Sequence, residues 1–315
     1  MLTFDKIKLV TSLSYITITD EDSFERKGKG AEIHSLYFSM NFPFKLSLKV
    51  DYESGELVIE FTGKVLGQNY SRLISMETIL ECLQNINKLG GFVLDAEGII
   101  YDSRVVSCDV TRDVDCDDIP SVTKFIAGNV RNRRKYTCRS KNNGNLIVEK
   151  NVDTSMYKRR LTIYDKHREM NMTKNSRYKE IYDIDEDAFE GKLRLEMNLG
   201  SMAQIRTVLK VEDNELLSVL SSSADPITEF VDEFLSDAPA SSVSPSSKRE
   251  YEASLVLQDC GYDLDAVEAK LRLLSGRSFH PQRDMAIYRD LLNRGQVDGG
   301  FTKEKILQMI RGVSK

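Results

Sequence analysis

Hydrophobic and polar residues alternate over short segments in the first two hundred residues of the chain. Residues 44–50 and 56–61 alternate on either side of a polar, glycine-containing segment at 51–55, and this pattern predicts a β-hairpin. Further strand-like segments lie at residues 104–110, 145–149 and 160–164. The period of two residues therefore predicts a protein with a substantial sheet.

The segment at residues 192–199 shows the clearest alternation. Because successive side chains of a strand point to opposite faces, its leucines and Met197 share one face, and Arg194 and Glu196 share the other. The polar face of this strand therefore carries a cation and a carboxylate as neighbours.

Apolar residues at helical spacing predict helices between and after the strands. Residues 76–86 have this spacing, with Ser75 as a suitable N-cap and Gly90 as a stop signal. Pro120 suits the first turn of another helix. Further helical patterns lie at residues 250–261, 264–274, 284–294 and 303–311. We therefore expect a first domain at residues 1–220, a linker at 221–248 rich in Ser, Ala and Pro, and a C-terminal helical domain at 249–315.

The composition bounds the class of protein. The chain has 315 residues, no apolar run of membrane-spanning length and no signal-peptide pattern at its start. Its five cysteines form no CxxC pair, which favours reduced thiols in a cytoplasmic protein. Its three histidines lie far apart in the sequence, so a histidine-rich metal site is not expected.

The net charge of −5 hides a basic segment. Residues 124–179 contain sixteen Lys or Arg against four Asp or Glu, a local charge of +12, and tyrosines lie among them. Such a segment favours a polyanion partner, although a solvated basic surface is the alternative. The candidate phosphate contacts are Arg131, Arg133, Arg134, Lys135, Arg139, Arg159, Arg160 and Arg194.

Tyr164 ends the strand-like segment at residues 160–164, with Lys166 two positions and Glu169 five positions further on. A phenol can act as a nucleophile, and a nearby cation can stabilise a phenolate or the charge on a phosphate. Glu169 would then bind a metal or orient Lys166. The alternatives are a packed tyrosine and a surface carboxylate.

Several carboxylates suit a hard metal ion. Asp109 lies inside an apolar strand, where aspartate needs a partner or a metal, and Asp113 follows four residues later. Together with Glu196 and Glu169, these side chains are candidate ligands for Mg²⁺ or Mn²⁺. The alternatives are helix caps and an ion pair between Arg194 and Glu196 on one strand face. The motifs of nucleoside triphosphatases, dinucleotide-binding enzymes, serine hydrolases and zinc proteases are absent.

At these residues the chain resembles the rolling-circle replication initiators of filamentous phages and plasmids. Three segments carry the resemblance, in the same order as in that family: residues 107–109, 161–169 and 194–196. The resemblance covers roughly residues 100–210. It implies an α+β fold of the HUH-endonuclease type, with a central antiparallel sheet and helices packed on its face, followed here by a C-terminal helical extension.

The resemblance also implies an activity. A site-specific single-strand endonuclease and ligase would use Tyr164 as nucleophile and Lys166 as its cation, giving a 5′-phosphotyrosine and a free 3′-OH. Asp109 and Glu196 would bind Mg²⁺ or Mn²⁺, assisted by Asp113 or Glu169. The expected partners are single-stranded or hairpin origin DNA, a host helicase and polymerase, and a second copy of the chain in a homodimer, with no membrane.

Three other functions fit the same residues. A relaxase-like nickase would mobilise a genetic element with the same chemistry. A non-catalytic DNA-binding protein would use the carboxylates as ion pairs. A basic scaffold would bind proteins instead of DNA.

Overall fold

A computed structural model describes residues 2–29, 32–131, 135–141, 144–152, 158–236, 245–260, 263–275, 278–295 and 301–312. The chain forms two compact units, each made of two separate segments. The first unit comprises residues 1–113 and 154–227, and the second comprises residues 114–153 and 228–315.

This division differs from the predicted order of a domain at 1–220, a linker at 221–248 and a domain at 249–315. Residues from the middle of the chain join the second unit because their side chains pack with residues after the predicted boundary. The Tyr136 hydroxyl donates to Glu233 Oε1 at 2.7 Å, and the Phe125 and Phe301 rings lie 6.2 Å apart. Contacts of this kind leave no trace in local sequence patterns.

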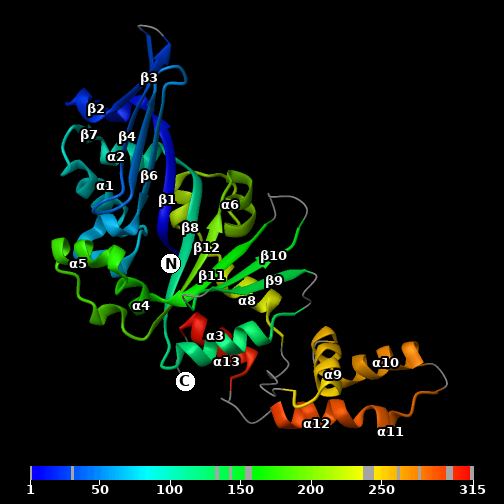
Figure 1. Cartoon of the computed structure of the whole chain (residues 1–315). Coiled ribbons are helices and arrows are strands. Elements are labelled where there is room, and N and C mark those ends of the chain that lie inside the picture. Colours follow the sequence, from blue (N-terminus) through cyan, green and yellow to red (C-terminus); the bar gives the residue numbers. More distant parts are fainter. Residues whose placement is uncertain are drawn as a thin grey trace. The chain divides into compact units, whose positions relative to one another are not determined.

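The first unit is built on an antiparallel sheet (Figure 1). Its strands lie in the order β3-β4-β5-β6-β1-β8-β12-β11. Their bounds are β1 (Thr3–Ser12), β3 (Glu25–Lys29), β4 (Glu32–Met40), β5 (Leu46–Asp51), β6 (Glu56–Thr62), β8 (Arg104–Asp115), β11 (Arg160–Asp165) and β12 (Lys192–Leu199). A separate pair is formed by β2 (Ile16–Ile18) and β7 (Phe92–Leu94). The predicted hairpin is β5–β6, and the predicted α+β class with a large antiparallel sheet is confirmed.

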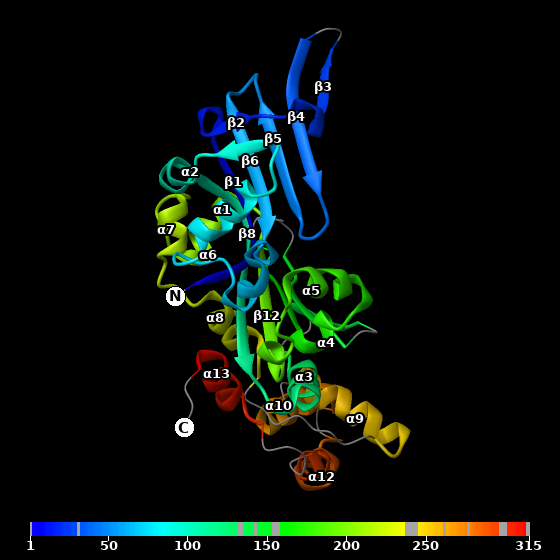
Figure 2. The same cartoon turned by 90° about the vertical axis from the view of Figure 1, so that its left-hand side faces the viewer.

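Helices cover both faces of this sheet. Figure 2 shows α1, α2, α6 and α7 on one side and α4 and α5 on the other. Their bounds are α1 (Ile79–Asn87), α2 (Ala96–Asp102), α4 (Lys166–Met170), α5 (Ser176–Tyr182), α6 (Met202–Leu209) and α7 (Leu216–Leu220). The 3₁₀ segment η3 (Gly63–Arg72) follows β6 directly. Buried residues alternate along β5 and β6, as the hydrophobic pattern predicts.

The second unit contains a strand pair and helices. Its elements are α3 (Ile119–Gly128), β9 (Tyr136–Ser140), β10 (Leu146–Lys150), α8 (Pro226–Phe234), α9 (Lys248–Asp259), α10 (Leu264–Ser275), α11 (Pro281–Asp284), α12 (Ala286–Gly295) and α13 (Lys303–Arg311). Four of the helices correspond to the predicted C-terminal patterns. Helix α8, in contrast, lies inside the predicted linker, because Phe230 and Phe234 are completely buried and order it. Across the described residues, we find no helix with the length and apolar character needed to cross a membrane.

Candidate functional site

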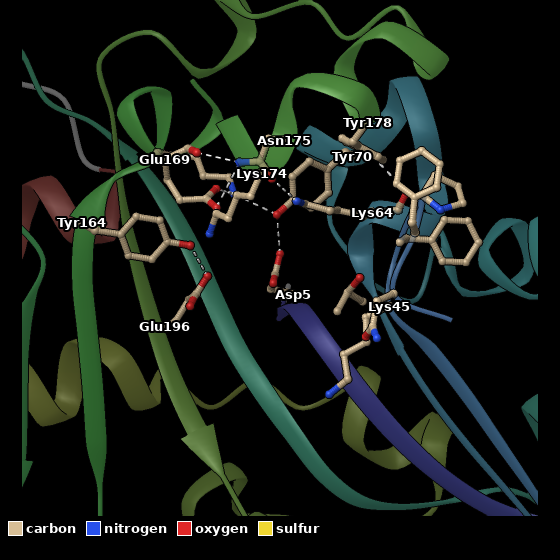
Figure 3. Close-up of a pocket in the computed structure, with 16 residues that line it drawn as sticks. Asp5, Lys45, Lys64, Tyr70, Tyr164, Glu169, Lys174, Asn175, Tyr178 and Glu196 are labelled. Carbon is tan, nitrogen blue, oxygen red and sulfur yellow. Dashed lines mark hydrogen bonds and ion pairs between the residues drawn. The ribbon is translucent and has the colours of Figure 1, made fainter. Parts of the chain in front are cut away.

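A pocket of about 370 Å³ opens in the first unit, beside the ends of β1, β11 and β12 (Figure 3). It is lined by phenols, lysines and carboxyl groups, with two phenylalanines at its edge. The polar lining residues are Asp5, Asn41, Lys45, Thr62, Lys64, Tyr70, Tyr164, Lys166, Glu169, Lys174, Asn175, Tyr178 and Glu196. Tyr164, Lys166, Glu169 and Glu196, all predicted from the sequence as site residues, therefore share one pocket.

Tyr164 and Glu196 form the central hydrogen bond of the pocket. Tyr164 lies opposite Arg194 in the register of β11 and β12, so Glu196 occupies the diagonal position on the same face. The Tyr164 hydroxyl donates to Glu196 Oε1 at 2.5 Å (Figure 3). Burial, and then the charge of Glu196, raise the pKa of Tyr164 well above its usual value. The phenol is therefore protonated at neutral pH, and its only route to a phenolate is transfer of that proton to a base.

Glu196 has the proton affinity that such a base needs. Burial, together with the charge of Asp5, raises the pKa of Glu196 to about 7, while the guanidinium of Arg194 opposes this rise. A carboxylate that titrates near neutral pH can accept a proton and release it again. Glu196 is thus placed and poised to take the proton of Tyr164.

Lys166 lines the pocket and is almost completely buried. Its Nζ donates to the Tyr70 hydroxyl and to Glu169 Oε2, both at 2.8 Å, and it lies 5.9 Å from the centroid of the Tyr164 ring. Burial lowers the pKa of Lys166, and the charge of Glu169 partly offsets this effect. Glu169 also accepts an ion pair from Lys174 at 2.8 Å. Although burial acts to raise it, the two ammonium groups hold the pKa of Glu169 well below its usual range.

Arg194 links three elements beneath the pocket. Its Nε and Nη2 donate to the two carboxylate oxygens of Asp113 at 2.6 and 2.7 Å. Its Nη1 donates to Asp5 Oδ1 at 3.0 Å and to the Tyr70 hydroxyl at 2.9 Å. Because the guanidinium is completely buried, Arg194 orients these groups and presents no surface to a DNA phosphate in this structure. Arg194 therefore pairs with Asp113 of β8 and not with Glu196 of its own strand, which was the alternative interpretation.

Asp109 lies away from the pocket. It accepts a hydrogen bond from Asn198 Nδ2 at 2.6 Å and pairs with Lys6 Nζ at 3.4 Å across the β1–β8 register. Asp109 and Asp113 are four residues apart on β8, about 13 Å along a strand. The partner that an in-strand aspartate needs is therefore a lysine of the neighbouring strand.

The four carboxylates predicted as metal ligands do not form one ligand set in this structure. Asp113 is held by Arg194, Glu169 by two lysines, and Asp109 lies outside the pocket. No three His, Cys, Asp or Glu side chains in the described parts of the chain are grouped to hold a metal ion. These residues do not fit a shared site for Mg²⁺ or Mn²⁺, so we assign no chemical step to a metal, and metal dependence stays a prediction.

The predicted phosphate contacts are divided between the units. Arg159 and Arg160 belong to the first unit, before and at the start of β11, and Arg160 is exposed. Arg131, Lys135 and Arg139 belong to the second unit, where Arg139 Nη2 donates to Glu149 Oε2 at 2.5 Å. Arg133 and Arg134 lie outside the described residues. The role of these side chains in DNA binding stays a prediction.

Two residues central to the site, Asp5 and Tyr70, were not predicted. The Tyr70 hydroxyl donates to Asp5 Oδ1 at 2.7 Å and accepts from Lys166 and Arg194. Asp5 has no register partner in β8, because the register shifts between Phe4 and Lys6 and leaves it in a bulge, where its backbone N–H donates to Thr111 Oγ1 at 3.1 Å. Bulges re-aim side chains and often lie next to functional sites. The signal was present in the sequence, where the apolar spacing changes from two residues to three between Phe4 and Ile7.

No protein-family model, curated protein or solved structure matches this chain.

Proposed function

We propose that this chain is a replication initiator that nicks one strand of DNA by transesterification through Tyr164, on a fold of the HUH-endonuclease type. The observation that carries the proposal is the hydrogen bond from the Tyr164 hydroxyl to Glu196, at a pocket lined with lysines. An antiparallel sheet whose neighbouring strands supply the phenol and its proton acceptor supports the HUH-like assignment.

The reaction needs a proton acceptor because the phenol is protonated. As Tyr164 Oη attacks the phosphorus, its proton passes to Glu196, the O–P bond to tyrosine forms and the P–O3′ bond breaks. The products are a 5′-phosphotyrosine and a 3′ oxygen that takes up a proton to become a free hydroxyl. Attack by a 3′-OH on the phosphotyrosine reverses the step and returns the proton to Tyr164, so rejoining needs no ATP.

The lysines of the pocket serve the phosphate. Lys166 Nζ lies 5.9 Å from the centroid of the Tyr164 ring, and Lys174 lies at the rim, 62% exposed, where its ammonium can reach a phosphate oxygen. The basic segment at residues 124–179 supports a polyanion as the substrate, with Arg131, Arg133, Arg134, Lys135, Arg139, Arg159 and Arg160 as backbone contacts. A single-stranded or hairpin origin would be the DNA, and a polymerase would extend the free 3′ end.

Covalent capture of DNA tests this function. The wild-type protein is incubated with labelled single-stranded oligonucleotides that tile the DNA around its gene, with Mg²⁺, with Mn²⁺ or with EDTA. We expect an adduct on a denaturing gel with the wild type and none with Tyr164→Phe. Tyr101, a 75% exposed tyrosine on α2, provides the matched control, since Tyr101→Phe should form the adduct normally. An adduct that persists in Tyr164→Phe contradicts the proposal, and the EDTA arm tests metal dependence.

A second candidate is a DNA-binding protein without catalysis. It is favoured by the ion pairs of Asp113 with Arg194 and of Glu169 with Lys166, which give these carboxylates a structural role. Such a protein binds the oligonucleotides but forms no covalent product under any of the three metal conditions, so the same experiment separates the two candidates.

A further inference from the structure

Lys64 lies on the side of the pocket away from Tyr164 (Figure 3). It belongs to η3 and is half-buried. Its Nζ donates to Asn175 Oδ1 at 2.6 Å and lies 5.1 Å from the centroid of the Tyr178 ring. Both of these partners are electrically neutral.

Among the described residues, the other lysines of the pocket each form an ion pair with a carboxylate, in contrast to Lys64. Lys166 and Lys174 each pair with Glu169 at 2.8 Å, and Lys45 pairs with Glu60 at 3.1 Å. Within the described ranges of the chain, no carboxylate forms an ion pair with Lys64. Burial lowers the pKa of Lys64, and the more distant charges of Glu169 and Asp5 offset this only in part. A desolvated ammonium with neutral partners is stabilised by an anion that enters the pocket.

The surrounding residues hold Lys64 in place before any ligand arrives. The Tyr178 hydroxyl donates to the backbone carbonyls of Lys64 and Gly67, at 3.0 and 3.2 Å. Asn175 Nδ2 donates to the backbone carbonyl of Glu169 at 2.6 Å, which directs the amide oxygen of Asn175 towards Lys64. An anion that binds here therefore loses little free energy to ordering the side chain.

An aromatic ring lines the same pocket. Phe42, between β4 and β5, is 38% exposed, and the guanidinium of Arg177 lies 4.3 Å from the centroid of its ring. Exposed aromatic rings next to cations are the platforms on which single-stranded nucleic acids stack their bases. The pocket thus offers a cation and a ring in addition to the groups around Tyr164.

We propose that Lys64 and Phe42 form a second nucleotide subsite, which binds a phosphate and the base of a nucleotide next to the cleaved linkage of a DNA strand. The inference rests on the proposed function, since it places the strand in the pocket of Tyr164. In this arrangement Lys64 contacts a phosphate that is not cleaved, and Phe42 stacks on the adjoining base. The subsite sets the position of the strand relative to Tyr164.

Binding without cleavage tests the subsite. All variants carry Tyr164→Phe, and a short dye-labelled single-stranded DNA oligonucleotide is titrated by fluorescence anisotropy at several salt concentrations. We expect Lys64→Gln to weaken binding about tenfold and to reduce the slope of log K against log salt by about 0.7, the loss of one phosphate contact. Phe42→Ala, in an exposed loop, should weaken binding about tenfold with the slope unchanged.

Lys88 provides a matched control. Its Nζ also donates to an asparagine Oδ1, that of Asn85 at 2.7 Å, but it is exposed and does not line the pocket. Lys88→Gln should therefore bind as the parent does. If Lys64→Gln does not fold, as judged by circular dichroism, Phe42→Ala and the charge-preserving Lys64→Arg, which should retain binding, carry the test.

The outcomes separate this inference from the proposed function. Equal affinity and salt slope in Lys64→Gln and the parent overturn the subsite, even where the wild type forms the adduct. Weakened binding in Lys64→Gln supports the subsite, even where no adduct forms. A third outcome is that Lys64→Gln weakens the binding of inorganic phosphate and leaves the affinity for the oligonucleotide unchanged. The pocket then binds a free phosphate ion only, and the subsite is overturned.

Discussion

Arg194 donates from two nitrogens to both carboxylate oxygens of Asp113, at 2.6 and 2.7 Å, and its guanidinium is completely buried. The same side chain reaches Asp5 and Tyr70, so one arginine holds together β1, β8, β12 and η3 beneath the pocket. Buried and bidentate, this pair is the kind of ion pair that is costly to break.

Removal of Arg194 should therefore destabilise the first unit. We expect Arg194→Met to lower the free energy of unfolding by about 3–5 kcal/mol, because Asp113 and Asp5 lose their cation in a buried setting. Urea denaturation measures the change. Arg104→Met is the control, since Arg104 pairs with Glu56 at the surface at 3.4 Å and its loss should cost under about 1 kcal/mol. Equal losses in the two variants would contradict the prediction.

The raised pKa of Glu196 predicts a pH-dependent rate. Since Glu196 must be unprotonated to accept the proton of Tyr164, the rate of adduct formation should rise as the pH increases through about 7. Glu196→Gln should lower the rate by about 10²–10⁴-fold and remove this rise. Single-turnover kinetics between pH 5.5 and 8.5 would measure both effects. A wild-type rate that does not change across this range would exclude Glu196 as the base.

The same pKa shift predicts how stability depends on pH. The pKa of Glu196 is raised from 4.5 in the unfolded chain to about 7, so the folded state binds the proton more tightly. Its stabilising contribution is therefore fully present below pH 4.5 and is lost as the pH rises through 7. Glu196→Gln should gain stability relative to the wild type as the pH rises from 4.5 to about 7, as measured by thermal melting. A constant difference in melting temperature over this range is the contrary result.

The contribution of Glu169 to stability should depend on pH in the opposite direction. Because the pKa of Glu169 is lower in the folded state, its carboxylate stabilises the folded state at any pH above its pKa in the unfolded chain. This contribution is lost as the pH falls. Glu169→Gln should lower the free energy of unfolding by about 3 kcal/mol at neutral pH, since buried Lys166 loses its carboxylate. The difference should shrink in acid. Glu186→Gln, which removes a more exposed pair with Lys179, should cost under about 1 kcal/mol in the same urea titration.

Gly67, in η3, should not tolerate a side chain. Gly67 lies in η3 with φ of 57°, and a Cβ there would meet Tyr182 Cδ1 at 2.7 Å. Backbone strain alone should make Gly67→Ala less stable by about 1–3 kcal/mol. The clash of the new Cβ with Tyr182 should in addition displace η3, which carries Lys64 and Tyr70. Thermal melting checks the stability. Gly55, whose φ is 70° and whose Cβ would meet nothing, separates strain from contact, since Gly55→Ala should cost less.

Much of the strand and helix content could be read from the sequence. The period of two placed Arg194 and Glu196 on one face of a strand, and the structure confirms it in β12. The hairpin β5–β6 and the helices α9, α10, α12 and α13 also follow from local patterns, because apolar spacing reports which face of an element is buried. Tyr164 and Lys166 were predicted as site residues because they flank the end of one strand, and both line the pocket.

Only the tertiary structure decided which charged groups meet. Strands β1, β8, β12 and β11 are neighbours although they are distant in the chain, and this order brings Asp5, Asp113, Arg194 and Tyr164 together while Asp109 pairs with Lys6. A local pattern fixes the face of a side chain but not its cross-strand partner, since partners depend on strand order and register. The bulge at Asp5 and the position of Lys64 in η3 also depend on strand order and register, so the local sequence pattern does not determine them. Tyr164, the proposed nucleophile, was therefore visible in the sequence, whereas the fold arranged Glu196, the buried Arg194 and Lys64 around it.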